Sequence, residues 1–159
     1  MESSGVDVIA TELGIIEQLI EIYYKEEWWH QEKKSYTQAV NYYNVLLKKG
    51  NILYYEIEGR VVGYVEFWRI NFEQWGKIVC HEKIYIDIED ISNGNICYVT
   101  NVWINKEYRN TDVVKTLTLN FFKQNYRCDY FVGEALRKKT QPIKVFKRSE
   151  LHSKLFTGG

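Results

Sequence analysis

Apolar residues form a strand pattern and then a helix pattern between residues 96 and 125. Ile96–Ile104 is rich in β-branched and aromatic residues, which is typical of a buried strand. After a short polar turn that carries Arg109, apolar residues recur at the spacing of an amphipathic helix: Val114, Leu117, Phe121 and Phe122. A strand that runs into a helix N-terminus presents unpaired N–H groups and the positive end of a dipole, so this turn is a candidate anion site.

The N-terminal third predicts a short strand followed by two helices. Residues 5–10 alternate well enough for a strand. Thr11 suits a helix N-cap, and apolar residues at helical spacing then predict a helix over residues 11–32. A second helix starts at the capping box formed by Ser35 and Gln38, and Gly50 ends it in the C′ position.

The middle of the chain predicts a β-hairpin. Ile52–Ile57 and residues 61–70 are its strands, and Glu58-Gly59-Arg60 is its tight turn. Residues 71–95 are less regular, with the start of a helix near Phe72 and a strand over residues 84–88.

The C-terminal part predicts a strand, a helix and a last strand. Residues 130–136 form an apolar run typical of a strand. Gln141-Pro142 places Pro at the first position of a final helix that carries Ile143 and Phe146. Residues 151–156 add a short strand.

Composition predicts one domain over residues 1–159. The 45% hydrophobic content supports a substantial core. We expect no membrane span and no signal peptide, because the sequence has no long apolar run and no basic region followed by an apolar one near its start. The histidines are isolated, so no metal site is expected. An odd number of cysteines without paired short spacing indicates reduced thiols and a cytoplasmic location: Cys80, Cys97 and Cys128.

Charge is balanced overall but unevenly spread. The first thirty residues carry seven acidic residues against Lys25 alone, whereas residues 106–154 carry twelve basic and five acidic residues. The basic part is either a solvated face or a surface for a phosphate-bearing ligand, an acidic partner or a nucleic acid. Nucleic acid is the least favoured of these, because no base-reading motif accompanies the charge.

Residues 98–114 resemble the signature of the GNAT superfamily of N-acetyltransferases. In that family a central strand ends in an apolar pair, and Arg/Gln-x-x-Gly-x-Gly/Ala then opens a helix. Here Val102-Trp103-Ile104 ends the strand, and Arg109 stands at the first motif position. The order of predicted elements is similar to that family over roughly residues 6–151, with an insertion at about 71–95. The resemblance implies an α/β (α+β) fold, a twisted mixed β-sheet flanked by about four helices.

The resemblance implies that amides of the turn hold the pyrophosphate of acetyl-CoA, which would be the cofactor. The implied cofactor-binding residues are Val102, Ile104, Arg109, Asn110, Thr111, Asp112, Val113 and Val114. The family's two glycine positions are Asp112 and Val114 in this chain. We expect the Asp112 carboxylate to cap the helix and repel a pyrophosphate, and the branched Val114 side chain to stand where the family keeps bare backbone. Arg109 is then a phosphate ligand, or a surface or core-anchoring cation.

The family's proton-transfer positions also differ. Tyr98 stands where histone-type members carry a base glutamate, and a Tyr with a pKa of about 10 is a poor base near neutrality. Glu66 is the other candidate base, or else a solvent-facing strand residue. The predicted last helix aligns Phe146 with the family's general-acid Tyr, so Tyr130 is the candidate replacement.

Two functions therefore compete. The first is a divergent acyl-CoA N-acyltransferase acting on an amine, with further CoA phosphate contacts from Arg137, Lys138 or Lys139. The acidic group Asp87, Glu89 and Asp90 then either receives the amine or is a solvated loop. The second is a catalytically inactive, protein-binding module, as in phage structural and assembly components (a virion-associated location), whose contacts include Trp28, Trp29 and Trp75.

Overall fold

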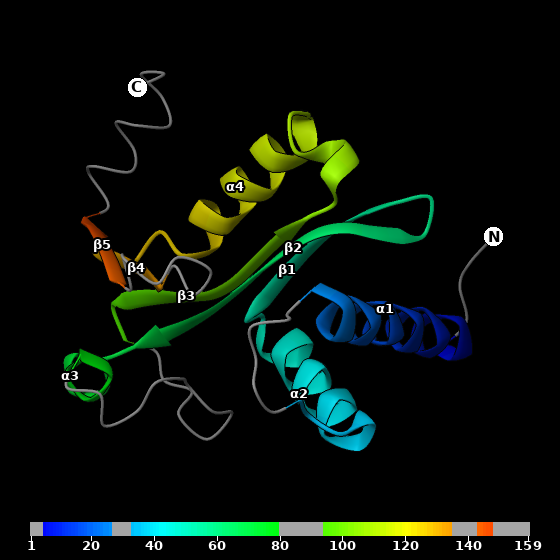
Figure 1. The fold of residues 1–159 in the computed structure, drawn as a ribbon, viewed down its shortest axis with the longest axis horizontal. Coiled ribbons are helices and arrows are strands. Elements are labelled where there is room, and N and C mark those ends of the chain that lie inside the picture. Colours follow the sequence, from blue (N-terminus) through cyan, green and yellow to red (C-terminus); the bar gives the residue numbers. More distant parts are fainter. Residues whose placement is uncertain (1–4, 27–32, 80–93, 135–142, 148–159) are drawn as a thin grey trace.

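A computed structural model of the chain describes residues 5–26, 33–79, 94–134 and 143–147 (Figure 1). Its strands form one five-stranded sheet in the order β1-β2-β3-β4-β5. Only the β3–β4 pair is parallel, so the sheet is mixed, and the predicted α+β class is confirmed. The strands are β1 Ile52–Ile57, β2 Arg60–Ile70, β3 Ile96–Ile104, β4 Tyr130–Glu134 and β5 Ile143–Lys147. The helices are α1 Gly5–Glu26, α2 Tyr36–Lys49, α3 Phe72–Val79, the 3-10 turn η2 Lys106–Tyr108, and α4 Asp112–Gln124.

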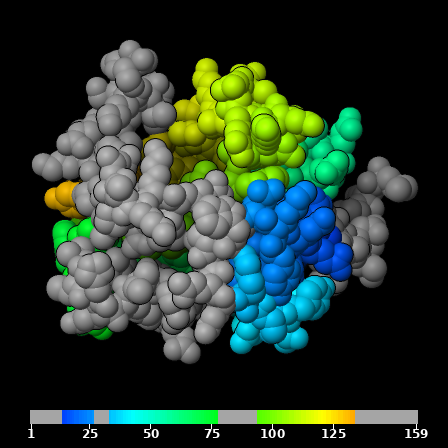
Figure 2. Space-filling model, in the orientation of Figure 1, coloured from blue at the N-terminus to red at the C-terminus, as the bar shows by residue number. Residues whose placement is uncertain are grey.

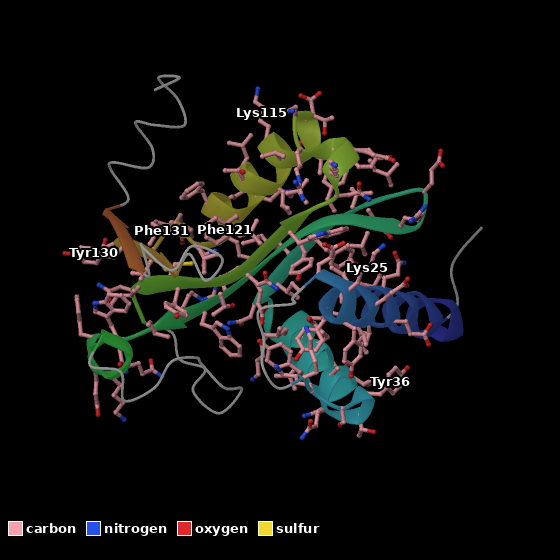
Figure 3. All side chains as sticks on the ribbon, viewed as in Figure 1. Lys25, Tyr36, Lys115, Phe121, Tyr130 and Phe131 are labelled. Atoms are coloured by element: carbon pink, nitrogen blue, oxygen red, sulfur yellow. The ribbon has the colours of Figure 1, made fainter. Side chains whose placement is uncertain are left out.

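Helices cover both faces of the sheet. α1 and α2 lie against one face and α4 against the other (Figures 1 and 2). The core on the α1/α2 face includes Leu19, Tyr43, Leu46, Trp68 and Tyr98. The core on the α4 face includes Val65, Phe67, Cys97, Leu117 and Phe121, and Figure 3 shows Phe121 and Phe131 between α4 and the sheet. Because both faces are covered, every residue of β2 from Val61 to Trp68 is buried.

A β-bulge at Thr100 determines which side chains of β3 point to each face of the sheet. Glu66 of β2 pairs with Asn101, and the next residue, Phe67, pairs with Val99, so Thr100 is the extra residue. The Thr100 hydroxyl donates to the Glu66 carbonyl oxygen at 3.3 Å. Asn101 therefore shares the α1/α2 face with Tyr98 although the two are three positions apart.

Local signals predicted α2 and the hairpin correctly. Ser35 accepts from the Gln38 amide at 3.2 Å, the Gln38 side chain accepts from the Ser35 amide at 2.9 Å, and Gly50 ends the helix at φ +70°. Glu58 and Gly59 form the hairpin turn with φ values of 51° and 81°, as a two-residue turn with left-handed residues requires. The predicted helix start at Phe72 is also confirmed.

Two predicted elements are wrong. Residues 5–10 are the start of α1 rather than a strand, and Thr11 lies inside that helix instead of capping it. Val6, Ile9 and Ala10 also fit the helical spacing i, i+3, i+4, which continues along α1. The predicted last helix is strand β5, antiparallel to β4, and its two β-branched residues, Ile143 and Val145, favour a strand.

Other predicted features lie outside the described residues. These are the strands at 84–88 and 151–156, the end of the first helix beyond Glu26, the pair Trp28 and Trp29, the acidic group Asp87, Glu89 and Asp90, and the bases Arg137, Lys138 and Lys139. In the ranges that the structure describes, no helix has the length and apolar character needed to span a membrane.

Candidate functional site

The candidate anion site is a tightly bonded turn between β3 and α4. The Asn105 amide donates to the Val62 carbonyl oxygen at 2.8 Å, which ties the end of β3 to β2. The Asn105 side chain then accepts from the Glu107 amide at 3.0 Å and starts η2. The Thr111 hydroxyl donates to the Tyr108 carbonyl oxygen at 2.7 Å, so the turn enters α4 in one defined conformation.

Thr111, not Asp112, caps α4, which corrects the expected capping by the aspartate. Thr111 has an extended backbone, and its hydroxyl oxygen accepts from the Val113 amide at 3.3 Å. Asp112 is the first helical residue and is exposed. Its carboxylate therefore adds negative charge to the helix N-terminus without occupying the Val113 amide.

Arg109 lies at the same end of the helix. Its side chain is exposed, and its Nε donates to the carbonyl oxygen of Ile104, the last residue of β3, at 3.1 Å. This bond holds a guanidinium between the strand end and the first turn of α4. The position suits an anion that also contacts the first-turn amides.

The backbone at the two glycine positions of the GNAT motif is ordinary. Among the described residues, the only non-glycine residue with positive φ is Glu58, so neither Asp112 nor Val114 is in a left-handed conformation. Replacing glycine there adds side-chain bulk and charge without backbone strain. Val114 is half-buried, whereas Val113 is buried at 4% exposure and belongs to the core side of the helix. Asn110 and Thr111 are exposed.

β3 extends beyond its pairing with β4. The register joins Ile96–Val99 to residues 130–133, and β3 then continues to Ile104 beside the turn. Val102 faces α4 in this stretch, because it pairs with Val65, yet it is 51% exposed. Ile104 packs against the α4-face core. The part of β3 from Thr100 to Ile104 therefore leads directly into the turn that carries Arg109 and the N-terminus of α4.

Glu66 belongs to the opposite face of the sheet and is not a solvent-facing residue. It is 4% exposed, and the Tyr42 hydroxyl of α2 donates to its Oε1. Beside it, Asn101 Nδ2 donates to the Tyr64 hydroxyl at 2.7 Å. A buried carboxylate is retained only with polar partners, so this group of polar side chains is a second candidate site.

Tyr98 and Tyr130 lie on the α1/α2 face with Glu66. Tyr98 is 2% exposed and pairs with Trp68 of β2, while Tyr130 is half-buried, and its ring centroid lies 6.1 Å from that of the exposed Phe72. The alignment that placed Phe146 in a last helix is wrong, because that segment is strand β5.

Tyr42 and Asn101 are polar partners that the sequence did not reveal. Tyr42 follows the apolar spacing of α2 and has the sequence character of a core residue. Asn101 faces Tyr64 only because the Thr100 bulge shifts the phase of β3. Among the described residues, no group of three His, Cys, Asp or Glu side chains is placed to hold a metal ion.

No protein-family model matches the chain, and no curated protein sequence matches it. Among solved structures, it is similar to an N-acetyltransferase from Staphylococcus aureus Mu50, with a TM-score of 0.52 and 10% identity over 90% of this chain and 74% of that chain. It is also similar to the GphF GNAT-like decarboxylase in complex with isobutyryl-CoA, with a TM-score of 0.50 and 16% identity over 74% of this chain. The chain has the GNAT fold.

The predicted GNAT resemblance is thereby confirmed at the level of the fold. The chain spans 60% of the length of the GphF structure that it matches. The segment whose sequence carried the resemblance is the unit β3–η2–α4. Glu66 lies in the neighbouring strand β2, and its side chain is on the face of the sheet opposite α4. The identity and roles of site residues do not follow from a likeness at these identities.

Proposed function

We propose that this GNAT-fold chain is an N-acyltransferase that moves an acetyl or other acyl group from acyl-CoA to an amine. The observation that carries this function is the position of Arg109 and the α4 N-terminus at the end of β3, beyond the pairing of that strand with β4. Val102 and Ile104 lie on the part of β3 that has no β4 partner among the described residues, and the acyl thioester arm would run along this strand edge, between the two faces of the sheet. Arg109 and the first-turn amides supply positive charge for the phosphates.

The residues of the turn fit an acyl-CoA in most respects. The amides of the first turn are those that a helix leaves without intrahelical acceptors, and Thr111 takes only the one of Val113. Arg109 is held by its bond to Ile104 with its guanidinium exposed. Asp112 opposes phosphate binding by like charge, but its exposure to solvent weakens that repulsion.

Glu66 is the group that we assign as the base. In acyl transfer the amine nitrogen forms a bond to the thioester carbonyl carbon, the carbon–sulfur bond breaks, and the electron pair of that bond leaves with the sulfur. The proton lost by the amine passes to the carboxylate and finally to the leaving thiolate. Tyr130 is not assigned the role of donor to the thiolate, because it pairs with Ile96, five positions along β3 from Asn101, the partner of Glu66.

The second candidate function is a binding module that has lost catalysis. It is favoured by one observation, the exposed carboxylate of Asp112 at the N-terminus where a phosphate would lie. In this function protein contacts replace the acyl-CoA.

Isothermal titration of acetyl-CoA and CoA into the purified protein distinguishes the two functions. We expect micromolar binding by the parent chain. Asp112→Asn and Asp112→Gly should raise the affinity roughly fivefold, since removing one like charge at a helix N-terminus changes binding by about 1 kcal/mol. Glu107→Gln removes another exposed carboxylate, from η2, and serves as the matched control with little expected effect.

Binding by the parent would justify a screen of amine acceptors. Binding only by the Asp112 variants would mean that the carboxylate closes a GNAT site, and the binding module would then be the better description. If neither parent nor variants bind either compound, the acyltransferase function is rejected.

A further inference from the structure

We propose that Tyr42 of α2 is the positioning residue for Glu66, holding its carboxylate charged and oriented toward the acceptor amine. This role rests on the proposed function, in which Glu66 is the base. It begins from one contact between distant parts of the chain, the hydrogen bond from the Tyr42 hydroxyl to Glu66 Oε1.

Glu66 needs such a partner because of where it lies. The side chain is 4% exposed in a strand that is covered on both faces, and an ionised carboxylate in such surroundings is unstable without hydrogen-bond donors. Tyr42 reaches it from α2, which is 24 residues away in sequence, so the contact depends on the packing of the helix on the sheet.

The neighbouring polar groups complete a defined environment. Asn101 Nδ2 donates to the Tyr64 hydroxyl at 2.7 Å, which fixes the Tyr64 oxygen beside Glu66 on the same sheet face. Trp68, the next residue of β2 on that face, has a fully buried Nε1 with no acceptor among the described residues. The Tyr42 and Trp68 ring centroids are 6.3 Å apart, so the same tyrosine packs along both side chains.

A cation also acts on Tyr42. Lys34 Nζ lies 4.4 Å from the centroid of the Tyr42 ring. A positive charge over a phenol ring polarises its O–H group and makes it a better donor. Among the described residues, the titratable groups on this face are two lysines beside the helices and the tyrosines of the core and its edge: Lys33, Lys34, Tyr23, Tyr42, Tyr43, Tyr64, Tyr98 and Tyr130.

Carbon-13 NMR of the glutamate carboxyl groups tests this role without requiring turnover. Glu66→Gln identifies the Glu66 signal by its loss. Because a hydrogen bond to the charged form favours that form, Tyr42→Phe should move the midpoint of Glu66 protonation upward by about one pH unit. Tyr36→Phe makes the same change at an exposed position on the same helix (Figure 3) and should leave the midpoint unchanged.

Turnover, once an acceptor is found, gives a second readout. Tyr42→Phe should reduce kcat about tenfold below the original midpoint and recover partly at higher pH. In the Glu66→Gln background the same change should have no further effect on kcat, because Tyr42 acts through the carboxylate. Thermal unfolding of each variant verifies that it is folded.

Failure of the positioning role of Tyr42 can be told apart from failure of the proposed function. An unchanged Glu66 midpoint in folded Tyr42→Phe, or additive losses in the double variant, overturns the positioning role even if the protein acylates amines. A shifted midpoint supports the control of Glu66 by Tyr42. Absence of acyl-CoA binding and turnover in the parent rejects the proposed function and the catalytic part of the role with it, whatever the midpoint shows.

Discussion

At the scale of single residues, burial sets the chemistry of Cys97. This thiol is completely buried on the α4 face of the sheet. Burial, followed by a hydrogen bond with the Cys128 thiol and the charge effect of that group, raises the pKa of Cys97 well above its usual range, and Arg69 lowers it only in part. The thiol therefore stays protonated in the folded protein at pH values where an exposed thiol ionises.

This raised pKa predicts a loss of stability at alkaline pH. Above about pH 9 the unfolded chain releases a thiol proton that the folded chain keeps, so the free energy of unfolding should fall by up to about 1.4 kcal/mol per pH unit. Below the pKa of the unfolded thiol the contribution is fully present. Urea unfolding between pH 7 and 10 measures the slope, and Cys97→Ala should show a shallower slope than the parent. Equal slopes would contradict the assignment.

Glu66 illustrates what the sequence could not reveal at this scale. A glutamate among apolar strand residues has the appearance of the solvent side of a half-covered sheet. Its burial follows from the packing of α1 and α2 on a face that the strand sequence does not describe. Likewise, the composition of the turn predicted a helix N-terminus. Whether Thr111 or Asp112 caps it depends on which of the two has the extended backbone of an N-cap, and the sequence does not determine this.

At the scale of elements, patterns with strong local chemistry were predictable and weak ones were not. The capping box of α2, the hairpin turn and the full extent of β3 followed from residue types at fixed spacing. The start of α1 and the strand β5 could not be predicted in this way, because each is a short segment whose apolar positions fit both helical and strand spacing. Pairing with β4 stabilises residues 143–147 as a strand, and that partner is not local.

Alanine substitution at two glycines, Gly50 and Gly14, should change the stability of the protein in opposite directions. Gly50 has φ +70°, and an added Cβ would lie 2.9 Å from Gln124 Nε2, so Gly50→Ala should destabilise the protein by about 1–2 kcal/mol. Gly14 lies inside α1 with nothing within 4 Å of the added atom, and Gly14→Ala should stabilise by about 0.5–1 kcal/mol. Urea midpoints measure both, and a gain at Gly50 would mean that its left-handed conformation is not required.

At the scale of the whole molecule, the two cores share one sheet. Trp68 and Tyr98 fill the α1/α2 face, and the neighbouring Phe67 and Cys97 on the same strands fill the α4 face. Loss of either core removes the support of strands that the other core needs. The described part of the chain should therefore unfold as one cooperative unit.

Cooperative unfolding is measurable with one probe for each face. In a Cys80→Ser background, near-ultraviolet circular dichroism reports mainly on the aromatic α1/α2 face, and thiol labelling reports on Cys97 and Cys128. The two urea transitions should coincide within error. A thiol transition at clearly lower urea would show that α4 separates from the sheet before the other face opens.

The bulge at Thr100 makes the chain unequally tolerant of changes in length. Because Thr100 is the extra residue of the bulge, its deletion leaves Val99 opposite Phe67 and Asn101 opposite Glu66, so the remaining side chains of β3 keep their present faces. Deletion of a regularly paired residue of β3 instead turns side chains to the other face of the sheet. Loss of one residue is therefore tolerated at the bulge and not at the paired positions on either side of it.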